Sequence, residues 1–149
     1  MIDLYTASTP NGWKASITLE ELEMPYEVHA IDLTSGAQKK PDFLAIAPNN
    51  RMPAIVDPEG PGGEPISIFE SGAILKYLAE KAGGALYPAD PARRVIVDQW
   101  LFYGSATFTT HAQQLGLFLH RFPEDVPPAK KHYAELYRDM CGVFDKRLD

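Results

Sequence analysis

The most informative stretch of the sequence runs from residue 51 to residue 78 and reads RMPAIVDPEGPGGEPISIFESGAILKYL. The brief apolar segment 54–57 predicts a strand, and the Pro- and Gly-rich segment 58–65 predicts a hairpin loop. The segment 66–68, Ile-Ser-Ile, is then the returning strand. This hairpin predicts an antiparallel edge of a sheet.

A helix from about Glu70 to Lys81 follows the hairpin, because apolar residues recur there at helical spacing. These residues are Ile74, Leu75, Tyr77 and Leu78. Ser67, Glu70 or Ser71 can cap the first turn of this helix. The pair Gly83-Gly84 is a termination signal.

The residues before the hairpin predict a strand–helix–strand unit. Residues 1–7 read as a short buried strand, and residues 13–24 have helical apolar spacing up to the stop at Pro25. Residues 26–31 alternate at period two, which indicates a half-buried strand, and residues 42–47 predict a short helix. A parallel strand pair with a crossover helix, extended by the antiparallel hairpin, makes a mixed α/β sheet.

The chain changes character after residue 83. Residues 92–119 and 129–148 carry long apolar patterns at helical spacing, and prolines separate the two patterns. We therefore predict an α/β domain at 1–83, a linker at 84–91 and an all-helical domain at 92–149.

The composition excludes several classes of protein. The chain has 149 residues, 45% of them apolar, and a formal charge of −6, which is typical of a globular fold. It has no basic run suited to nucleic acid. The N-terminus is unlike a signal peptide and no apolar run reaches membrane-spanning length. We expect a cytoplasmic protein that binds neither nucleic acid nor a membrane.

Metal chemistry and protein thiol chemistry are also expected to be absent. The four histidines, at 29, 111, 120 and 132, form no pair at ligand spacing and stand in no ligand pattern beside a carboxylate. We expect no metal site and no covalently bound cofactor. The single cysteine, Cys141, excludes an internal disulfide and a CxxC pair, and its place on a helical apolar face is typical of a core residue.

Several segments, taken in order, resemble those of cytosolic glutathione transferases. They are Met1-Ile2-Asp3-Leu4-Tyr5, Thr9-Pro10-Asn11-Gly12, PNNRMPAIVD at 48–57 and FESGAILKYL at 69–78. The turn at 9–12 and the segment Gly36-Ala37-Gln38 are most similar to the bacterial nu class, whose members reduce disulfides with glutathione. The resemblance implies a thioredoxin-like α/β domain with a mixed four-stranded sheet, followed by an all-helical domain. That helical domain is expected to be truncated, because the chain is shorter than is usual in the family.

The resemblance also implies a set of glutathione-binding residues. A cis bond between Met52 and Pro53 would present the Met52 backbone to the cysteinyl unit of glutathione, like an added β-strand. The Ser71 hydroxyl and N–H are expected to bind the γ-glutamyl carboxylate at the positive end of a helix, and Glu70 the γ-glutamyl ammonium. Gln38 is expected to hold the glycine end.

The turn-rich segment 8–12 takes the place where thioredoxin-like redox proteins carry a cysteine pair, and it contains no cysteine. Thr9, through its hydroxyl or its N–H, and Asn11, through its amide, are the catalytic candidates, as donors that stabilise the glutathione thiolate. The alternative interpretation is that both residues only cap a helix.

The long helical pattern supplies candidates for a second-substrate pocket, namely Tyr103, Phe108 and His111, although core packing is the favoured interpretation for them. His132 stands where relatives often place an arginine that reaches the glutathione carboxylate across a dimer. A truncated helical domain would leave apolar faces exposed, and a homodimer would cover them.

The resemblance implies a glutathione-dependent enzyme. A bound glutathione thiolate attacks a small or protein-mixed disulfide, and a second glutathione resolves the product, which leaves oxidised glutathione. Conjugation of glutathione to an electrophile is a variant that stays open. The alternative from another class is a non-catalytic transferase-fold module used for dimerisation or protein binding.

Overall fold

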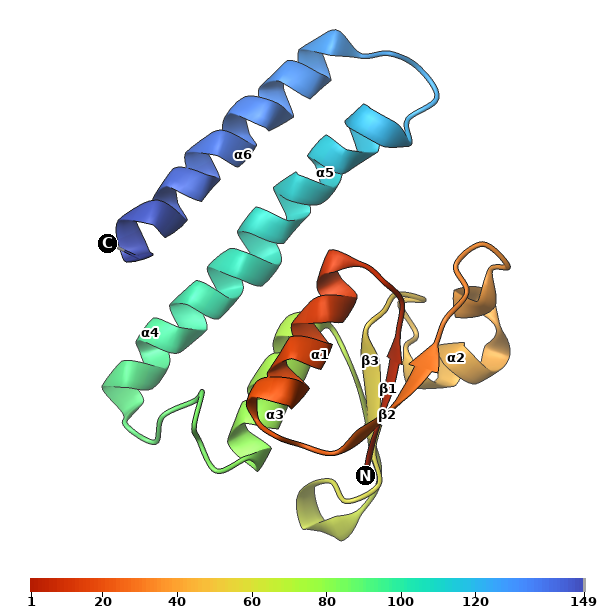
Figure 1. Cartoon of the computed structure of the whole chain (residues 1–149), viewed down its shortest axis with the longest axis vertical. Coiled ribbons are helices and arrows are strands. Elements are labelled where there is room, and N and C mark those ends of the chain that lie inside the picture. Colours follow the sequence, from red (N-terminus) through yellow and green to blue (C-terminus); the bar gives the residue numbers. More distant parts are fainter. Residues whose placement is uncertain (149) are drawn as a thin grey trace. The chain divides into compact units, whose positions relative to one another are not determined.

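The computed structural model describes residues 1–148, which form two compact units, Met1–Arg94 and the residues from Val95 onward. The first unit is a sheet covered by helices, and the second consists of long helices (Figure 1). The division after Arg94 falls just beyond the linker expected at 84–91, and the domain limits themselves stay a prediction.

The sheet has four strands within the described residues, in the order β2-β1-β3-β4. The strands are β1 (Ile2–Thr6), β2 (Tyr26–Ala30), β3 (Ala54–Asp57) and β4 (Ile66–Phe69). β1 and β2 run parallel, because a helix crosses between them, whereas β3 runs antiparallel to both β1 and β4. The predicted parallel pair and the predicted hairpin edge are both confirmed.

The crossover helix α1 (Pro10–Glu21) begins earlier than the predicted start at residue 13. Thr9 is its N-cap, since the Thr9 Oγ1 accepts a hydrogen bond of 3.1 Å from the Gly12 N–H, and Pro10 takes the first helical position, which suits proline. Most of the segment interpreted as a turn is therefore the first turn of this helix. The helix ends at Glu21, short of the predicted end at residue 24.

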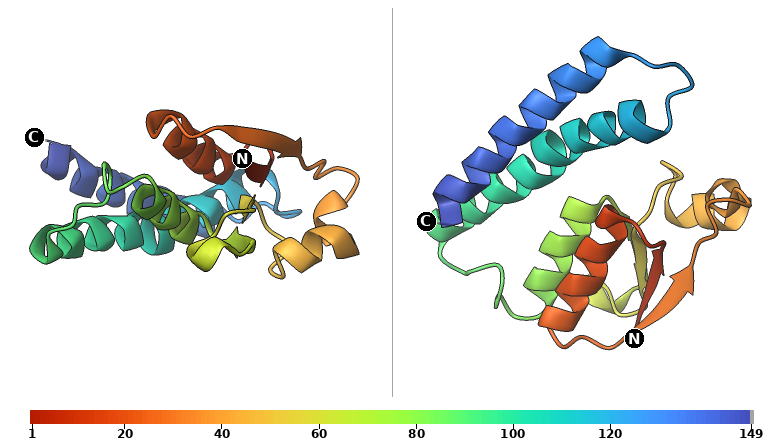
Figure 2. Two further views of the ribbon diagram at one scale, coloured as in Figure 1. Left: turned by 90° about the horizontal axis from the view of Figure 1, so that it is seen from below. Right: turned by 45° about the horizontal axis from the view of Figure 1, so that its top comes forward.

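Two small cores lie on opposite faces of the sheet. α1 and α3 (Ser71–Lys81) pack against each other on one face, and α2 (Pro41–Ile46) lies on the other (Figures 1 and 2). The core under α1 and α3 contains Ile2, Leu4, Ala15, Leu19, Ile55, Ile74 and Leu78. The core under α2 contains Phe43, Ala47 and Ala54. Alternation along β1 explains this division, because Leu4 and Tyr5 point to opposite faces.

Helix α3 differs from its prediction at one end and agrees at the other. Glu70 occupies the N-cap position but makes no capping hydrogen bond with its side chain, so the predicted side-chain cap is wrong. At the other end, Gly83 and Gly84 have φ of 81° and 90°, a conformation that glycine adopts without steric cost, and the predicted stop is confirmed.

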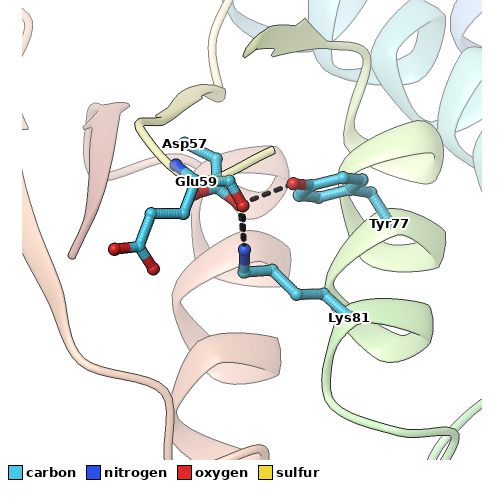
Figure 3. A network of polar contacts seen from close by, with 4 residues as sticks. All are labelled: Asp57, Glu59, Tyr77 and Lys81. Carbon is cyan, nitrogen blue, oxygen red and sulfur yellow. Dashed lines mark hydrogen bonds and ion pairs between the residues drawn. The ribbon is translucent and has the colours of Figure 1, made fainter. Parts of the chain in front are cut away.

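A buried carboxylate fixes the end of β3 to α3 (Figure 3). The Asp57 Oδ2 accepts a hydrogen bond of 2.5 Å from the Tyr77 hydroxyl and lies 2.8 Å from the Lys81 Nζ, while its Oδ1 accepts the Glu59 N–H at 2.9 Å. Lys81 also donates to the carbonyl of Glu59. The hairpin and the helix are therefore held together by a paired charge and not only by apolar contacts.

The second unit is built from long helices. They are α4 (Pro91–Phe102), which begins in the last residues of the first unit, a π-helical segment η3 (Tyr103–Phe108), α5 (Thr109–His120) and α6 (Pro127–Leu148). The predicted pattern over 92–119 is confirmed as helical, with η3 in its middle, and α5 packs along α6 (Figure 1). None of the described helices combines the length and apolar character needed to cross a bilayer.

Candidate functional site

The register of the sheet brings three predicted segments to one end of it. Tyr5 pairs with Ala54, and Ala54 pairs with Phe69. Because β3 is antiparallel to its neighbours, the start of β3 lies between the ends of β1 and β4. The residues that follow β1, precede β3 and follow β4 therefore meet at this end. They are Thr9 and Asn11, Met52 and Pro53, and Glu70 and Ser71.

Two helices begin at this same end. α1 follows the end of β1 and α3 follows the end of β4, and the two helices pack against each other. A helix N-terminus carries partial positive charge and unpaired N–H groups. This end of the sheet therefore favours negatively charged groups, such as a carboxylate or a thiolate.

Of the two donors predicted for Thr9, the hydroxyl and the backbone N–H, only the hydroxyl remains available. Its N–H donates to the carbonyl of Ala7 at 2.7 Å, so this backbone group is already used within the turn. Its Oγ1 accepts the Gly12 N–H, and the hydroxyl proton remains as a donor. Both interpretations of Thr9 apply to the same side chain, which caps α1 and retains one O–H.

Asn11 is held by a neighbour that the sequence analysis did not single out. The Lys14 Nζ donates to the Asn11 Oδ1 at 2.9 Å. An ammonium group has donors only, so it requires the amide oxygen on its side and leaves the NH2 group directed elsewhere. Residues 11 and 14 are one turn apart on α1, which is a spacing that brings side chains together.

Gly12 was read only as a turn residue, and the structure gives it a packing role. A Cβ at this position would lie 2.4 Å from the carbonyl oxygen of Ala7 and 2.4 Å from the Thr6 Oγ1. Only glycine fits, because the first turn of α1 passes this close to the end of β1. The signal in the sequence was a glycine directly after Thr-Pro-Asn.

The peptide bond between Met52 and Pro53 is cis, as predicted. Pro53 is buried and Met52 packs against the core under α2. Among residues 1–148, no other residue hydrogen-bonds to the Met52 N–H or C=O.

Glu70 and the loop before Met52 are joined by Asn49. The Asn49 Nδ2 donates to the Glu70 Oε1 at 2.9 Å, and the Asn49 Oδ1 accepts the Arg51 N–H at 3.2 Å. Glu70 has φ of 73°, which is rare for a residue with a side chain and is found at functional sites more often than elsewhere. Asn49 belongs to the motif at 48–57, but nothing in the sequence marks it as the residue that bridges to Glu70.

The remaining predicted glutathione-binding residues are Ser71 and Gln38. Ser71 is the first residue of α3, at the positive end of the helix. Gln38 lies in the short helix η1 (Ala37–Lys39), and its Oε1 is buried without a hydrogen-bond partner in the described part of the chain. A buried acceptor without a donor is unusual and fits a site completed by another molecule.

The second-substrate candidates make their described contacts within the helical unit. The Tyr103 hydroxyl donates to the carbonyl of Met140 at 3.0 Å, and the rings of Tyr103 and Phe108 each lie 5.1 Å from that of Phe144. His111 Nδ1 lies 2.8 Å from the carbonyl oxygen of Thr107. These contacts are those of helix packing.

His132 is exposed, and its ring meets the ring of Tyr133 edge to face at 5.2 Å. This position does not test whether His132 reaches glutathione across a dimer, which stays a prediction.

One cluster escaped the sequence analysis, which looked for metal ligands by spacing along the chain. Register pairs Asp3 with Glu27 and Tyr5 with His29, so all four side chains share one face of the sheet. The His29 Nε2 lies 2.8 Å from the Asp3 Oδ1, and the ligand atoms of Asp3, Glu27 and His29 lie within 4.8 Å of one another. The expectation that no histidine stands in a ligand pattern beside a carboxylate is therefore wrong for His29, because strand pairing brings Asp3 and Glu27 next to it.

Comparison with known proteins agrees with this geometry. The domain described as "Glutathione S-transferase, N-terminal domain" matches residues 1–80. The chain is 45% identical over 151 residues to the disulfide-bond oxidoreductase YfcG of Escherichia coli (strain K12), across all of this chain and 69% of that protein.

Solved structures are similar over nearly the whole chain. A glutathione transferase family member from Pseudomonas fluorescens, with two glutathione bound, has a TM-score of 0.93 at 40% identity, over 97% of this chain and 64% of that one. A glutathione transferase from Pseudomonas putida, with one glutathione disulfide per subunit, has a TM-score of 0.91 at 41% identity, over 99% and 64%. The chain spans slightly less than two thirds of these two proteins. The predicted thioredoxin-like fold is confirmed, and the chain belongs to the glutathione S-transferase family.

Proposed function

We propose that the chain uses reduced glutathione to reduce disulfides. The observation that supports this most is the first turn of α1, where Thr9 and Asn11 offer hydrogen-bond donors at a helix N-terminus and no cysteine is present. Such donors stabilise an anion, and a thiol with a pKa of about 8.5 in water becomes more acidic beside them. The reacting thiolate would then belong to glutathione and not to the protein.

The other segments at this end of the sheet supply contacts along the glutathione molecule. The Met52 N–H and C=O pair with the cysteinyl unit as an added strand would. Ser71, at the start of α3, binds the γ-glutamyl carboxylate, and the Glu70 carboxylate, held by Asn49, binds the γ-glutamyl ammonium. Gln38 holds the glycine end, where its buried Oε1 can accept a hydrogen bond.

The reaction has two exchange steps. The glutathione thiolate attacks one sulfur of the substrate disulfide, which forms a mixed disulfide and releases the other half as a thiolate. A second glutathione thiolate attacks the mixed disulfide, which forms glutathione disulfide and releases the remaining half. None of these steps needs a metal ion.

The relatives support this choice of reaction over conjugation to an electrophile. YfcG is named a disulfide-bond oxidoreductase, and the two Pseudomonas proteins were solved with two glutathione or with glutathione disulfide. Both forms contain the two glutathionyl groups that the reaction joins. Conjugation stays a variant of the same site, because it needs the same thiolate.

Several further features belong to the proposal. The substrate disulfide would be small, and Tyr103, Phe108 and His111 are the candidates for its pocket. A homodimer and a cytoplasmic location are expected from the family, and His132 would take the place of the arginine that reaches across such a dimer.

The test is the rate at which the purified chain reduces a small disulfide at the expense of glutathione. Replacing Asn11 by Ala should lower kcat/KM by about 100-fold, as loss of one preorganised donor to an anion does. Replacing Ser71 by Ala should raise the KM for glutathione more than it lowers kcat.

Cys141 is the matched control, because it is the chain's single cysteine and lies on α6. The variant Cys141→Ala should retain the full rate. A large loss of activity in Cys141→Ala would contradict the proposal, since the reacting thiol would then be the protein's own. Absence of both activity and glutathione binding in the unmodified chain would favour the non-catalytic binding module.

A further inference from the structure

We propose that Lys14 is a positioning residue for the glutathione thiolate. It sets the orientation of the Asn11 amide and places a positive charge directly behind it. This inference rests on the function proposed above, and it adds a residue to which no role has been given there.

The two ends of the Asn11 side chain differ in what they offer a thiolate. A carboxamide can be turned by half a rotation so that its oxygen and its NH2 group exchange places. Only the NH2 end can donate to a thiolate, whereas the oxygen end would repel it. Something must select the orientation, and the Lys14 Nζ does so by donating to the Asn11 Oδ1 at 2.9 Å.

The position of Lys14 on α1 allows its side chain to reach Asn11. Asn11 lies in the first turn of the helix and Lys14 in the second, so the lysine reaches back toward the N-terminus along one face. The side chain is half-buried, and this burial lowers the pKa of its ammonium because desolvation disfavours the charged form. Lys14 is therefore less hydrated than a lysine on the open surface, and its charge lies beside the proposed anion site.

The positive charge of Lys14 acts on the Asn11 amide and on the thiolate beyond it. A hydrogen bond from a cation polarises the amide and strengthens the donation from its NH2 group. The charge itself also favours a thiolate over a thiol at short range. A pair that served only to stabilise the helix would leave the ionisation of the glutathione thiol unaffected.

The experiment is a pH titration of the ultraviolet absorbance of the thiolate in glutathione bound to the full chain. We compare the unmodified chain with Lys14→Met, Lys14→Arg and the control Lys131→Met. Lys131 also has a partner within its own helix, the Glu135 carboxylate at 4.0 Å, but its side chain is 80% exposed. Binding of S-methylglutathione, which has no ionisable thiol, is measured in parallel.

The expected result is that Lys14→Met raises the pKa of the bound thiol by about one unit. Lys14→Arg should retain most of the effect, because arginine also donates only, and Lys131→Met should match the unmodified chain. Affinity for S-methylglutathione should change by less than about twofold in Lys14→Met, since the variant removes a contact that acts on the sulfur charge. If Lys14→Met does not melt as the unmodified chain does, Lys14→Gln replaces it.

Two results separate this inference from the function on which it rests. If the unmodified chain lowers the thiol pKa and Lys14→Met lowers it equally, the role of Lys14 is overturned and the proposed function stands. If the unmodified chain binds neither glutathione nor S-methylglutathione, the proposed function fails, and the role of Lys14 fails with it.

Discussion

The sheet unit and the helical unit bury their apolar side chains to very different extents. In the first unit, Leu4, Leu19, Ile55, Ile74 and Leu78 are fully buried. In the described part of the second unit, Met140 is the single buried hydrophobic residue, while Val95 and Phe102 are 65% and 66% exposed. The first unit has a closed core, and the second has the aromatic contacts of packed helices without one.

The difference indicates which unit determines stability, and it agrees with the place proposed for the chemistry. A polar site needs fixed positions, and a closed core supplies them. The segments at the end of the sheet are each attached to a buried strand or helix, whereas the helical unit exposes large side chains along its helices. We therefore expect changes in the first unit to have large effects and matched changes in the second to have small ones.

The largest effect is expected from removing core volume. Leu4→Ala should destabilise the chain by about 3 kcal/mol, because Leu4 lies fully buried in the middle of β1. Leu119→Ala, at a residue that is 47% exposed on α5, should cost less than about 1 kcal/mol. Urea unfolding of both variants measures the difference. Equal losses at the two positions would show that the helical unit has a core of its own.

Two glycine substitutions, one in each unit, should change stability by a smaller amount and in opposite directions. Gly12→Ala should cost about 2 kcal/mol and weaken glutathione binding, because the new methyl group would collide with the carbonyl of Ala7. Gly116→Ala, in α5 where nothing beyond the neighbouring helix backbone lies within 4 Å of the new Cβ, should stabilise the chain by about 0.5–1 kcal/mol. Thermal melts of the two variants should therefore shift in opposite directions. A neutral Gly12→Ala would contradict the close approach of α1 to β1.

The buried Asp57 carboxylate predicts a smaller effect. Tyr77→Phe should cost about 1–2 kcal/mol, because it removes one of the hydrogen bonds to a buried charge while Lys81 and the Glu59 N–H remain. Denaturant unfolding at neutral pH measures this loss. A loss of unfolding free energy below a few tenths of a kcal/mol would mean that Lys81 alone satisfies the Asp57 Oδ2.

The same group predicts a dependence of stability on pH. Burial raises the pKa of Asp57, but the hydrogen bonds from Lys81, Tyr77 and the Glu59 N–H outweigh it and hold the pKa below its ordinary value of 3.8. A carboxyl group with a lowered folded-state pKa stabilises the protein above the ordinary value, and this contribution is lost as the pH falls through the folded-state pKa. The free energy of unfolding should therefore fall more steeply with acid in the unmodified chain than in Asp57→Asn. Parallel acid titrations would reveal the opposite trend if the carboxyl were protonated in the fold.

Local sequence patterns correctly predicted the elements that are fixed by their own turn and termination signals. The hairpin of β3 and β4 was predicted from a proline- and glycine-rich loop between short apolar runs, and the end of α3 from Gly83-Gly84. The start of α1 was misplaced, because Thr-Pro-Asn-Gly is both a turn signature and a helix-start signature. The choice between them depends on how closely the first turn of α1 approaches the end of β1 at Gly12, which the residue types alone do not show.

The sequence indicated some residues of the candidate site and missed others. Resemblance located the residues that follow β1 and β4 and precede β3, and the sheet register explains why they meet. Lys14 and Asn49 were missed, because no periodic pattern marks the side-chain hydrogen bonds that join them to Asn11 and Glu70. The contact between Asp3 and His29 was missed because it crosses two strands.

The most direct test of the glutathione site is a thermal melt of the purified chain with and without glutathione. Ligand at about 100 times its dissociation constant adds about 2.7 kcal/mol to the free energy of unfolding, which for a chain of this length raises Tm by several degrees. We expect a cooperative melt that shifts upward with glutathione, and an upward shift that is lost in Ser71→Ala. A cooperative melt that does not move at any glutathione concentration would contradict a glutathione site at this end of the sheet.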